Sequence, residues 1–260
     1  MKKHIILLIS LIVVLAGCGR FKEYNKTISI DNNDIDISIY STNKDKAQKA
    51  INDIETIYKK YNELLIDYNS KEKLTINENL QKIISVGELF KEYNNYIKFK
   101  PKINNNSVVK NNADINFYIN GLANQEIYEY LKSKGISKFK ISSSQFVLTG
   151  LPSGKDYYNI VLSSPFDDSI IKLLKSKNEY IVTKNINDPD FNNSNFNKNT
   201  ENVSVTVISN DISNTDYITS LLLMMPVDEG KKVAKKYDVD VIWCYTTNGK
   251  EKIEYTDGLK

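Results

Sequence analysis

The first folded segment of the chain is marked by alternation of apolar and polar residues. Isoleucines occur at every second position in two short runs within residues 28–40, and the polar residues 31–34 separate the runs. This period of two predicts a strand pair or hairpin. After the cap residues 41–43, apolar residues between Ala47 and Leu65 recur at helical spacing, which predicts a helix.

The middle of the chain has a less regular pattern. A second set of apolar residues at helical spacing covers about residues 79–96, and Lys100 and Pro101 end it. The polar, asparagine-rich stretch 104–112 follows, and a similar stretch covers residues 192–202. Both stretches are predicted to be surface loops.

The second half mixes short strand and helix patterns. Asn248 and Gly249 predict a tight hairpin turn between the last two strands. Strands and helices mix without regular β-α-β alternation or a repeat, so we expect a single α+β domain over residues 28–260. Strands are expected at 139–148, 157–162, 180–183, 203–209, 239–245 and 252–256, a short strand or turn entry at 114–118, and helices at 124–133, 169–175, 215–225 and 228–237.

The N-terminal segment has the pattern of an export signal. Lys2 and Lys3 precede an apolar run at residues 5–16, which is too short to span a membrane comfortably. The run leads into Leu-Ala-Gly-Cys, the form of a bacterial lipobox, in which Cys18 receives acyl chains such as palmitate after cleavage. We therefore expect residues 1–17 to be removed and residues 18–27 to form a lipidated tether. The protein would be held to the outer face of the bacterial cytoplasmic membrane. The alternative is a cleaved soluble signal peptide with a chance cysteine.

The small number of histidines and cysteines excludes several kinds of active site. The only histidine, His4, lies in the segment expected to be removed, and the only cysteines are Cys18 and Cys244. A mature chain without imidazole has no Ser-His-Asp triad, no Cys-His pair and no HExxH zinc site. With Cys18 lipidated, an intramolecular disulfide is excluded. Cys244, in the apolar run 241–245, is expected to be a buried packing residue.

The charge balance argues against a nucleic-acid partner. The chain has 35 basic and 32 acidic residues, a formal net charge of +3. It has no dense patch of lysine and arginine interleaved with aromatic residues. Neither GxGxxG nor GxxxxGK[ST] occurs, so a glycine-rich phosphate loop is also excluded.

One segment carries candidate metal chemistry. The predicted strand 203–209, a short loop and the predicted helix 215–225 form the strand-loop-helix arrangement that directs backbone N–H groups at an anion. Asp216 and Ser220 are four residues apart, so their oxygens are expected on one helix face within reach of one ion. Such oxygen ligands, together with phosphate oxygens, suit Mg²⁺. The alternative is that Asp216 only complements the helix dipole.

Several segments resemble the FAD:protein FMN transferases, the ApbE-type flavin transferases. Residues 204–222, which begin SVTVI and end DYITSLL, resemble that family's SVTV...ADALATAL segment. Residues 114–123, DINFYINGLA, stand where the family has DLGGIAKGYA, and residues 98–103, KFKPKI, resemble an altered GxFDPTxG. With the order of the predicted elements, the resemblance covers nearly the whole mature chain.

The resemblance implies a fold, a reaction and a set of site residues. The fold is a single α+β domain, and the reaction uses Mg²⁺ to cleave FAD and pass FMN to a Thr or Ser of an exported partner flavoprotein. Asp216 matches the family's metal-binding aspartate, and Ser220 stands where the family has a threonine. Asn120 and Gly121 stand where the family has a lysine and the glycine after it, so they are the implied cofactor-binding residues.

The chain also departs from the family's motifs. Asn120 replaces a lysine at the phosphate site, and Asn116 and Phe117 replace two glycines. Residues 184–185, Lys-Asn, stand where the family has Ser-Gly, and the segment near 191–201 has no counterpart of the family's histidine. General acid–base groups contribute about 10²- to 10⁴-fold to rate. Binding is compatible with these changes, whereas turnover is expected to be weakened.

Three functions therefore remain open from the sequence. The first is a Mg²⁺-dependent FAD:protein FMN transferase with altered loops. The second is a non-catalytic lipoprotein of the same fold that binds flavin, nucleotide or a flavoprotein. The third is an interaction lipoprotein that shares only the scaffold, because fold alone does not decide function.

Overall fold

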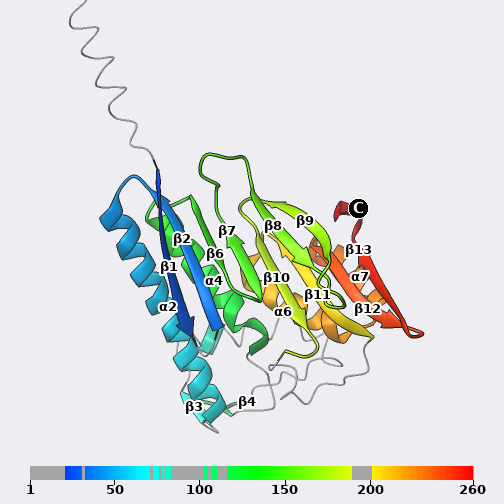
Figure 1. Cartoon of the computed structure of the whole chain (residues 1–260). Helices are drawn as coiled ribbons and strands as arrows, with labels where there is room; N and C mark the ends of the chain where they lie inside the picture. The colour runs from blue at the N-terminus through cyan, green and yellow to red at the C-terminus, as the bar shows by residue number, and fades with distance from the viewer. Residues whose placement is uncertain are drawn as a thin grey trace, which may run out of the picture.

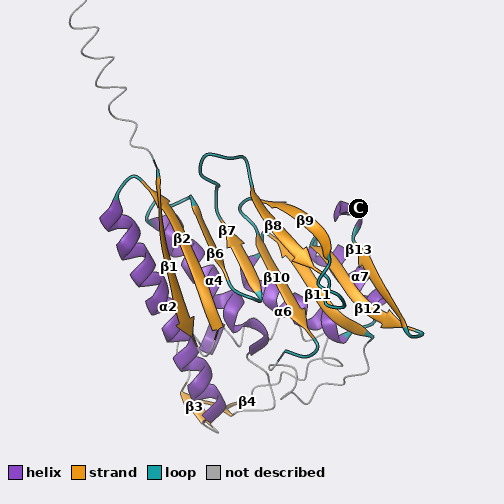
Figure 2. Ribbon diagram, viewed as in Figure 1, coloured by secondary structure: helices purple, strands orange, loops and turns teal. Residues whose placement is uncertain are grey.

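The chain is organised around an eight-stranded antiparallel sheet (Figures 1 and 2). The computed structural model describes residues 21–30, 33–70, 73–75, 78, 80–82, 102–104, 107–109, 116–188 and 201–259. In sheet order, the strands are β1 (Lys22–Ile30), β2 (Asn33–Ser41), β6 (Phe139–Ser142), β7 (Phe146–Thr149), β10 (Tyr180–Asn185), β11 (Asn202–Ser209), β12 (Asp240–Thr247) and β13 (Lys250–Tyr255).

Both faces of the sheet are covered, by different kinds of element. Helices pack on one face, and the two-stranded ribbon of β8 (Tyr158–Ser163) and β9 (Ile170–Ser176) crosses the other face in front of β10 and β11 (Figure 1). Alternation along β10 serves both layers: Val182 belongs to the main core with the helices, whereas Ile181 packs in a second cluster with the ribbon. Because both faces are covered, every residue of β10 and β11 is buried or half-buried.

The helical layer consists of α2 (Lys44–Ser70), α4 (Asn116–Ser133), α6 (Ile212–Met224) and α7 (Val227–Tyr237). Helix α4 packs between α2 and α6, and α6 lies directly on β10 and β11. Most of α6 is buried, including its polar residues Thr215, Asp216, Thr219 and Ser220. Buried polar groups need partners, so α6 is the helix on which specific polar contacts are expected.

Small elements complete the described structure. Strands β3 (Lys73–Thr75), β5 (Ser107–Val109) and β4 (Lys102–Asn104) form a three-stranded sheet near the end of α2 (Figure 1), and the 3₁₀ helix η2 (Asp257–Leu259) ends the described chain. Among the described helices, none is both long and apolar enough to span a bilayer.

Most predicted elements are confirmed. The hairpin of residues 28–40 is β1 paired with β2, and the first helical pattern is α2. The predicted turn at Asn248 and Gly249 joins β12 to β13, and both residues have positive φ, 51° and 71°, as such a tight turn requires. The mixed helices and strands confirm the expected α+β class.

Four predictions of secondary structure need correction, and a fifth lies mostly outside the described residues. Residues 169–175, predicted as a helix, form most of β9, because pairing with β8 overrides their ambiguous apolar pattern. The expected strand entry at 114–118 overlaps the start of α4, and 139–148 is two strands, not one. Residues 22–27, expected in the tether, extend β1 because β2 pairs with them. Most of the helical pattern at 79–96 lies outside the described residues.

Candidate functional site

Asp216 of α6 is buried among side chains of the sheet. The hydroxyl of Tyr180 donates a hydrogen bond to Asp216 Oδ2 at 2.6 Å. On the other oxygen, the Nζ of Lys184 lies 3.5 Å from Asp216 Oδ1, and the side chains of Lys184 and Asp216 are each only 3% exposed. Both oxygens of the carboxylate therefore face a protein donor.

The backbone of β10 explains why these two donors meet one carboxylate. Successive side chains of a strand point to opposite faces, so Tyr180, Val182 and Lys184 share the face that α6 covers. Asp216 projects from α6 onto this face and contacts the aromatic donor and the ammonium together. A single strand thus supplies both partners.

The hydrogen bonds continue from Tyr180 through the helical layer. Asn124 of α4 donates from Nδ2 to the Tyr180 hydroxyl at 2.9 Å, and its Oδ1 accepts from the hydroxyl of Tyr58 of α2 at 2.5 Å. We call Tyr58, Asn124, Tyr180, Asp216 and Lys184 the buried polar relay. It joins three helices to the sheet, and such a satisfied network specifies how these elements pack.

Burial controls the protonation of the relay. Desolvation raises the pKa of Tyr58 and of Tyr180 well above the usual range, and the negative charge of Asp216 acts in the same direction. Both phenols therefore stay protonated and act as donors. Burial also raises the pKa of Asp216, while Lys184 and the Tyr180 hydrogen bond oppose that rise. The two partners thus favour the carboxylate in a place where burial penalises its charge.

The hydroxyl of Ser220 is bonded to the backbone of its own helix. Its Oγ donates to the backbone oxygen of Asp216 at 2.9 Å, the back-bond that serine often makes one turn along a helix. Ser220 is also completely buried. The spacing of four residues therefore brings the hydroxyl into contact with the helix backbone.

Gly121 of α4 permits the close approach of α4 to α6. A Cβ at this position would lie 3.0 Å from the backbone oxygen of Ser213, 3.1 Å from Asp216 Oδ2 and 3.2 Å from the backbone oxygen of Ile212. The absence of a side chain is thus explained by helix packing beside Asp216. The structure gives Gly121, predicted to bind a cofactor, a packing role.

No protein-family model and no curated protein matches the chain. Among solved structures, the flavin transferase ApbE from Vibrio cholerae matches with a TM-score of 0.74 and 13% identity, covering 92% of this chain and 98% of that one. The chain has the fold of the ApbE flavin transferases.

Two further ApbE structures support this identification of the fold. The Pseudomonas stutzeri flavinyl transferase ApbE matches with a TM-score of 0.75 and 11% identity, covering 92% of this chain and 95% of that one. The ApbE protein from Thermotoga maritima matches with a TM-score of 0.66 and 13% identity, covering 91% and 98%. The resemblance found in the sequence is thus confirmed at the level of fold.

The residues of this ApbE fold do not suit the expected Mg²⁺ ion. Mg²⁺ needs free oxygen ligands in octahedral geometry. Here the two Asp216 oxygens face Tyr180 and Lys184, and the Ser220 hydroxyl is bonded to the backbone. In the part of the chain that the structure describes, no three His, Cys, Asp or Glu side chains gather as metal ligands. The prediction that Asp216 and Ser220 hold Mg²⁺ does not fit this arrangement.

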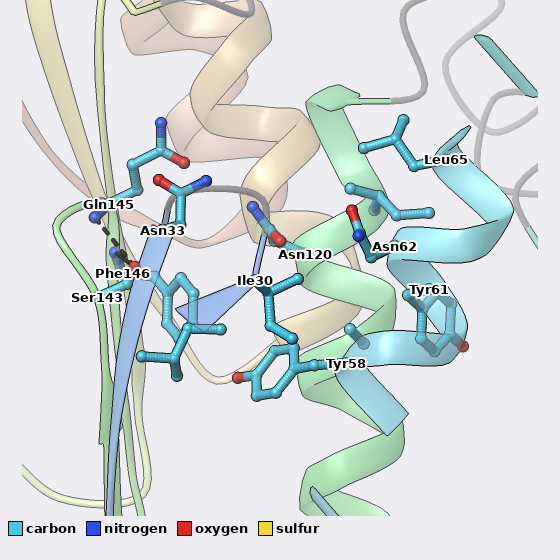
Figure 3. Close-up of a pocket in the computed structure, with 13 residues that line it drawn as sticks. Ile30, Asn33, Tyr58, Tyr61, Asn62, Leu65, Asn120, Ser143, Gln145 and Phe146 are labelled. Atoms are coloured by element: carbon cyan, nitrogen blue, oxygen red, sulfur yellow. Dashed lines mark hydrogen bonds between the residues drawn. The ribbon is translucent and has the colours of Figure 1, made fainter. Parts of the chain in front are cut away.

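Asn120, the other residue predicted to bind a cofactor, lines a cavity of about 90 Å³ (Figure 3). Four amide side chains line it, those of Asn33, Asn62, Asn120 and Gln145. Asn33 begins β2, Gln145 lies in the connection between β6 and β7, and Asn62 and Asn120 belong to α2 and α4. Apolar and aromatic side chains form the rest of the lining: Ile30, Ile35, Tyr58, Tyr61, Leu65, Ile119, Ala123 and Phe146, with the hydroxyl of Ser143. The cavity thus combines amide groups with an apolar wall.

The sequence pattern indicates Asp216 but not its partners Tyr180 and Lys184, nor Asn124, which donates to the Tyr180 hydroxyl. A signal for Lys184 exists. In the strand pattern at 180–183, positions 180 and 182 face the core, and position 184 continues the same face. A lysine at an inward position requires a buried acidic partner, because an unpaired buried charge is costly. Which carboxylate would meet it depends on how α6 docks.

Only one of the two cysteines lies in the part of the chain that the structure describes. Cys18, predicted to carry lipid, lies outside the described residues. Cys244 of β12 is buried, and burial raises the pKa of its thiol to about 11. An inert, protonated thiol agrees with the predicted packing role.

Proposed function

We propose that this protein is a lipid-anchored surface protein that binds FAD, or a related flavin nucleotide, without metal-assisted transfer of FMN. The observation that carries this proposal is the pairing of Asp216 with Lys184 and Tyr180, which occupies the carboxylate of the expected metal site. The fold supports a flavin ligand, and the altered site argues against the transfer step. This is the second of the three functions that the sequence leaves open.

The amide-lined cavity supports flavin as the ligand. An Asn or Gln side chain offers both donors and an acceptor, so the amides of Asn62, Asn120 and Gln145 can pair with the imide edge of a flavin ring. The ring of Phe146 belongs to the same lining and offers an aromatic surface. A cavity of about 90 Å³ is small beside the roughly 300–1,000 Å³ of ligand pockets. The edge of the ring would enter it, and the rest of the nucleotide would lie outside.

The competing function is Mg²⁺-dependent transfer of FMN from FAD to a Thr or Ser of an exported flavoprotein. The match to flavin transferases over nine-tenths of the chain favours it. Against it stand Asn120 in place of a lysine and the lack of any histidine after His4. Loss of one acid–base group costs about 10²- to 10⁴-fold in rate, so transfer would be slow at best.

A combined binding and transfer experiment separates these functions. The full-length protein is purified from membranes in detergent and titrated with FAD by fluorescence, with Mg²⁺ and with EDTA. We expect equal FAD binding in both buffers. Asn120→Ala should weaken binding about tenfold, because one hydrogen bond between the flavin and this amide is lost. The control Asn159→Ala, an exposed amide of β8 on the outer face of the ribbon, should bind like wild type.

The transfer arm adds a purified flavin-acceptor domain and examines it by in-gel flavin fluorescence. An unlabelled acceptor beside clear FAD binding agrees with the proposal. A fluorescent acceptor would establish the competing transferase function. Absence of FAD binding in every buffer would contradict both and favour a scaffold without a flavin ligand.

Membrane anchoring through Cys18 is a separate part of the proposal. Its support is the apolar run at 5–16 that leads into the lipobox-like sequence. Cys18→Ala should move the protein from the membrane fraction to the soluble fraction after export or leave it uncleaved. Cys244→Ala is the matched control and should stay with membranes. Mature Cys18→Ala protein that still sediments with membranes would contradict the lipid anchor.

A further inference from the structure

We propose that the ammonium of Lys184 is a built-in replacement for the divalent cation expected at Asp216. The Nζ lies 3.5 Å from Asp216 Oδ1, and the two side chains are buried together. The site then keeps a cation, but this cation belongs to the chain. This inference deepens the proposed function. It rests on that function only in taking Asp216 as the carboxylate of the expected metal site.

The position of Lys184 on β10 and the length of its side chain support this replacement. Lys184 stands where the resembled family has the serine of a Ser-Gly pair, on the face of β10 that α6 covers. A serine there would leave the space beside Asp216 Oδ1 open, whereas the lysine chain extends into it and ends in a positive charge. The change from serine to lysine therefore fills the expected position of the ion and supplies its charge.

The replacement has a chemical consequence. An ammonium carries one charge and three N–H donors, and it offers no open coordination positions for phosphate oxygens or water. A metal ion can bind Asp216 and a diphosphate together, because it accepts several oxygen ligands at once. With Lys184 in place, the charge of Asp216 is neutralised inside the protein. We therefore infer that the site is independent of divalent metal in folding and in ligand binding.

The other contacts of Asp216 hold the ion pair in position. Tyr180 occupies Oδ2 at 2.6 Å, and Gly121 lets α4 pack against the same oxygen. These contacts close the far side of the carboxylate, so an ion could approach only along Oδ1, where Lys184 lies. Removal of the lysine side chain should therefore reopen a cation position without changing the rest of the relay.

The experiment uses the full-length protein in detergent and Mn²⁺ as the probe, without flavin. Bound Mn²⁺ is measured by electron paramagnetic resonance of the free ion, and Tm is measured with Mg²⁺ and with EDTA. Wild type should bind no Mn²⁺ at Asp216 and show the same Tm in both buffers. Lys184→Ser should bind one Mn²⁺, and its Tm should rise by about 5–10 °C at a metal concentration about 100-fold above Kd.

Controls make each outcome decisive. Lys184→Ser with Asp216→Asn should bind no Mn²⁺, because the carboxylate is gone. Mn²⁺ binding by wild type that disappears in Asp216→Asn would overturn the proposal, whether or not the serine variant folds. A folded Lys184→Ser protein that binds no Mn²⁺ would also overturn it. If Lys184→Ser does not fold, Lys184→Gln takes its place, since it keeps more of the packing and lacks the charge.

Flavin is absent from every arm of this experiment. Failure of FAD to bind would contradict the proposed function and leave the metal result unaffected. Metal binding by wild type would contradict the replacement of the ion and leave FAD binding unaffected. The two failures are therefore distinguishable.

Discussion

Replacement of Lys184 by methionine is expected to lower the free energy of unfolding by about 3–5 kcal/mol. Methionine keeps most of the apolar length of the lysine side chain but removes the positive charge. Asp216, which is almost fully buried, would then lack the cation beside Oδ1. Breaking a buried ion pair in this way costs more than removing both charges, because the remaining charge is uncompensated.

Chemical denaturation of the full-length protein in detergent, with Lys175→Met as the control, measures this effect. Lys175 is an exposed lysine of β9 whose Nζ lies 4.7 Å from the centre of the Tyr157 ring, so its replacement should change the free energy of unfolding by no more than about 1 kcal/mol. Adding Asp216→Asn to Lys184→Met should recover much of the loss. Equal stability of the Lys184→Met and Lys175→Met proteins would contradict a stabilising ion pair.

The decrease in the free energy of unfolding caused by Lys184→Met should depend on pH. Burial already raises the pKa of Asp216, and removal of Lys184 raises it further. A carboxyl group whose pKa is raised by folding binds more protons in the folded state, so stability increases as pH falls toward its ordinary value of 3.8. The difference between wild type and Lys184→Met should therefore be smaller at acidic than at alkaline pH. A difference that does not change with pH would point to lost packing instead of lost charge.

Asn202→Ala is expected to lower the free energy of unfolding by about 2–3 kcal/mol. The Nδ2 of Asn202, at the start of β11, lies 3.0 Å, 3.2 Å and 2.8 Å from the backbone oxygens of Leu222, Leu223 and Met225. These carbonyls end α6, where the helix supplies no N–H partners of its own. Without the amide, buried carbonyls at the end of the helix lose their donor.

The measurement is again denaturation, with Asn159→Ala as the control. Asn159 is an exposed asparagine of β8, so the same change there should leave stability within about 0.5 kcal/mol of wild type. Asn202→Asp tests the mechanism, because it keeps the shape but replaces the donating amide with an acceptor. If Asn202→Asp were as stable as wild type, the amide would not be the donor that ends α6.

The amino-acid sequence predicted some residues of the candidate site but not the contacts between them. Asp216 and Gly121 stand out because they match positions of a family pattern. The partners of Asp216 do not stand out, since Tyr180 and Lys184 are 36 and 32 positions away in the chain, and only the docking of α6 on β10 brings them together. The metal interpretation rested on spacing along one helix and on the resemblance of Asp216 and Ser220 to a family pattern, and neither indicates which side chains a strand brings to Asp216.

Local pattern determined much of the fold. The alternating isoleucines of 28–40 predict β1 and β2, the helical stripe predicts α2, and Asn248 with Gly249 predicts the last turn. These features depend on neighbours close in sequence, namely side-chain period and backbone φ preference, so they can be read without a tertiary structure. The lack of a histidine after residue 4 is likewise a property of the sequence itself, and the predicted export signal at residues 1–17 also rests on local pattern alone.

Tertiary structure decided the elements and contacts that depend on distant partners. Residues 170–176 form β9 because β8 pairs with them, and polar residues 22–27 join β1 because β2 supplies their hydrogen bonds. Asp216 became one half of a buried ion pair because β10 places a lysine opposite it. Strand pairing and the burial of charge are energies between segments far apart in sequence, so neither can be assigned until the sheet and its helices have been brought together.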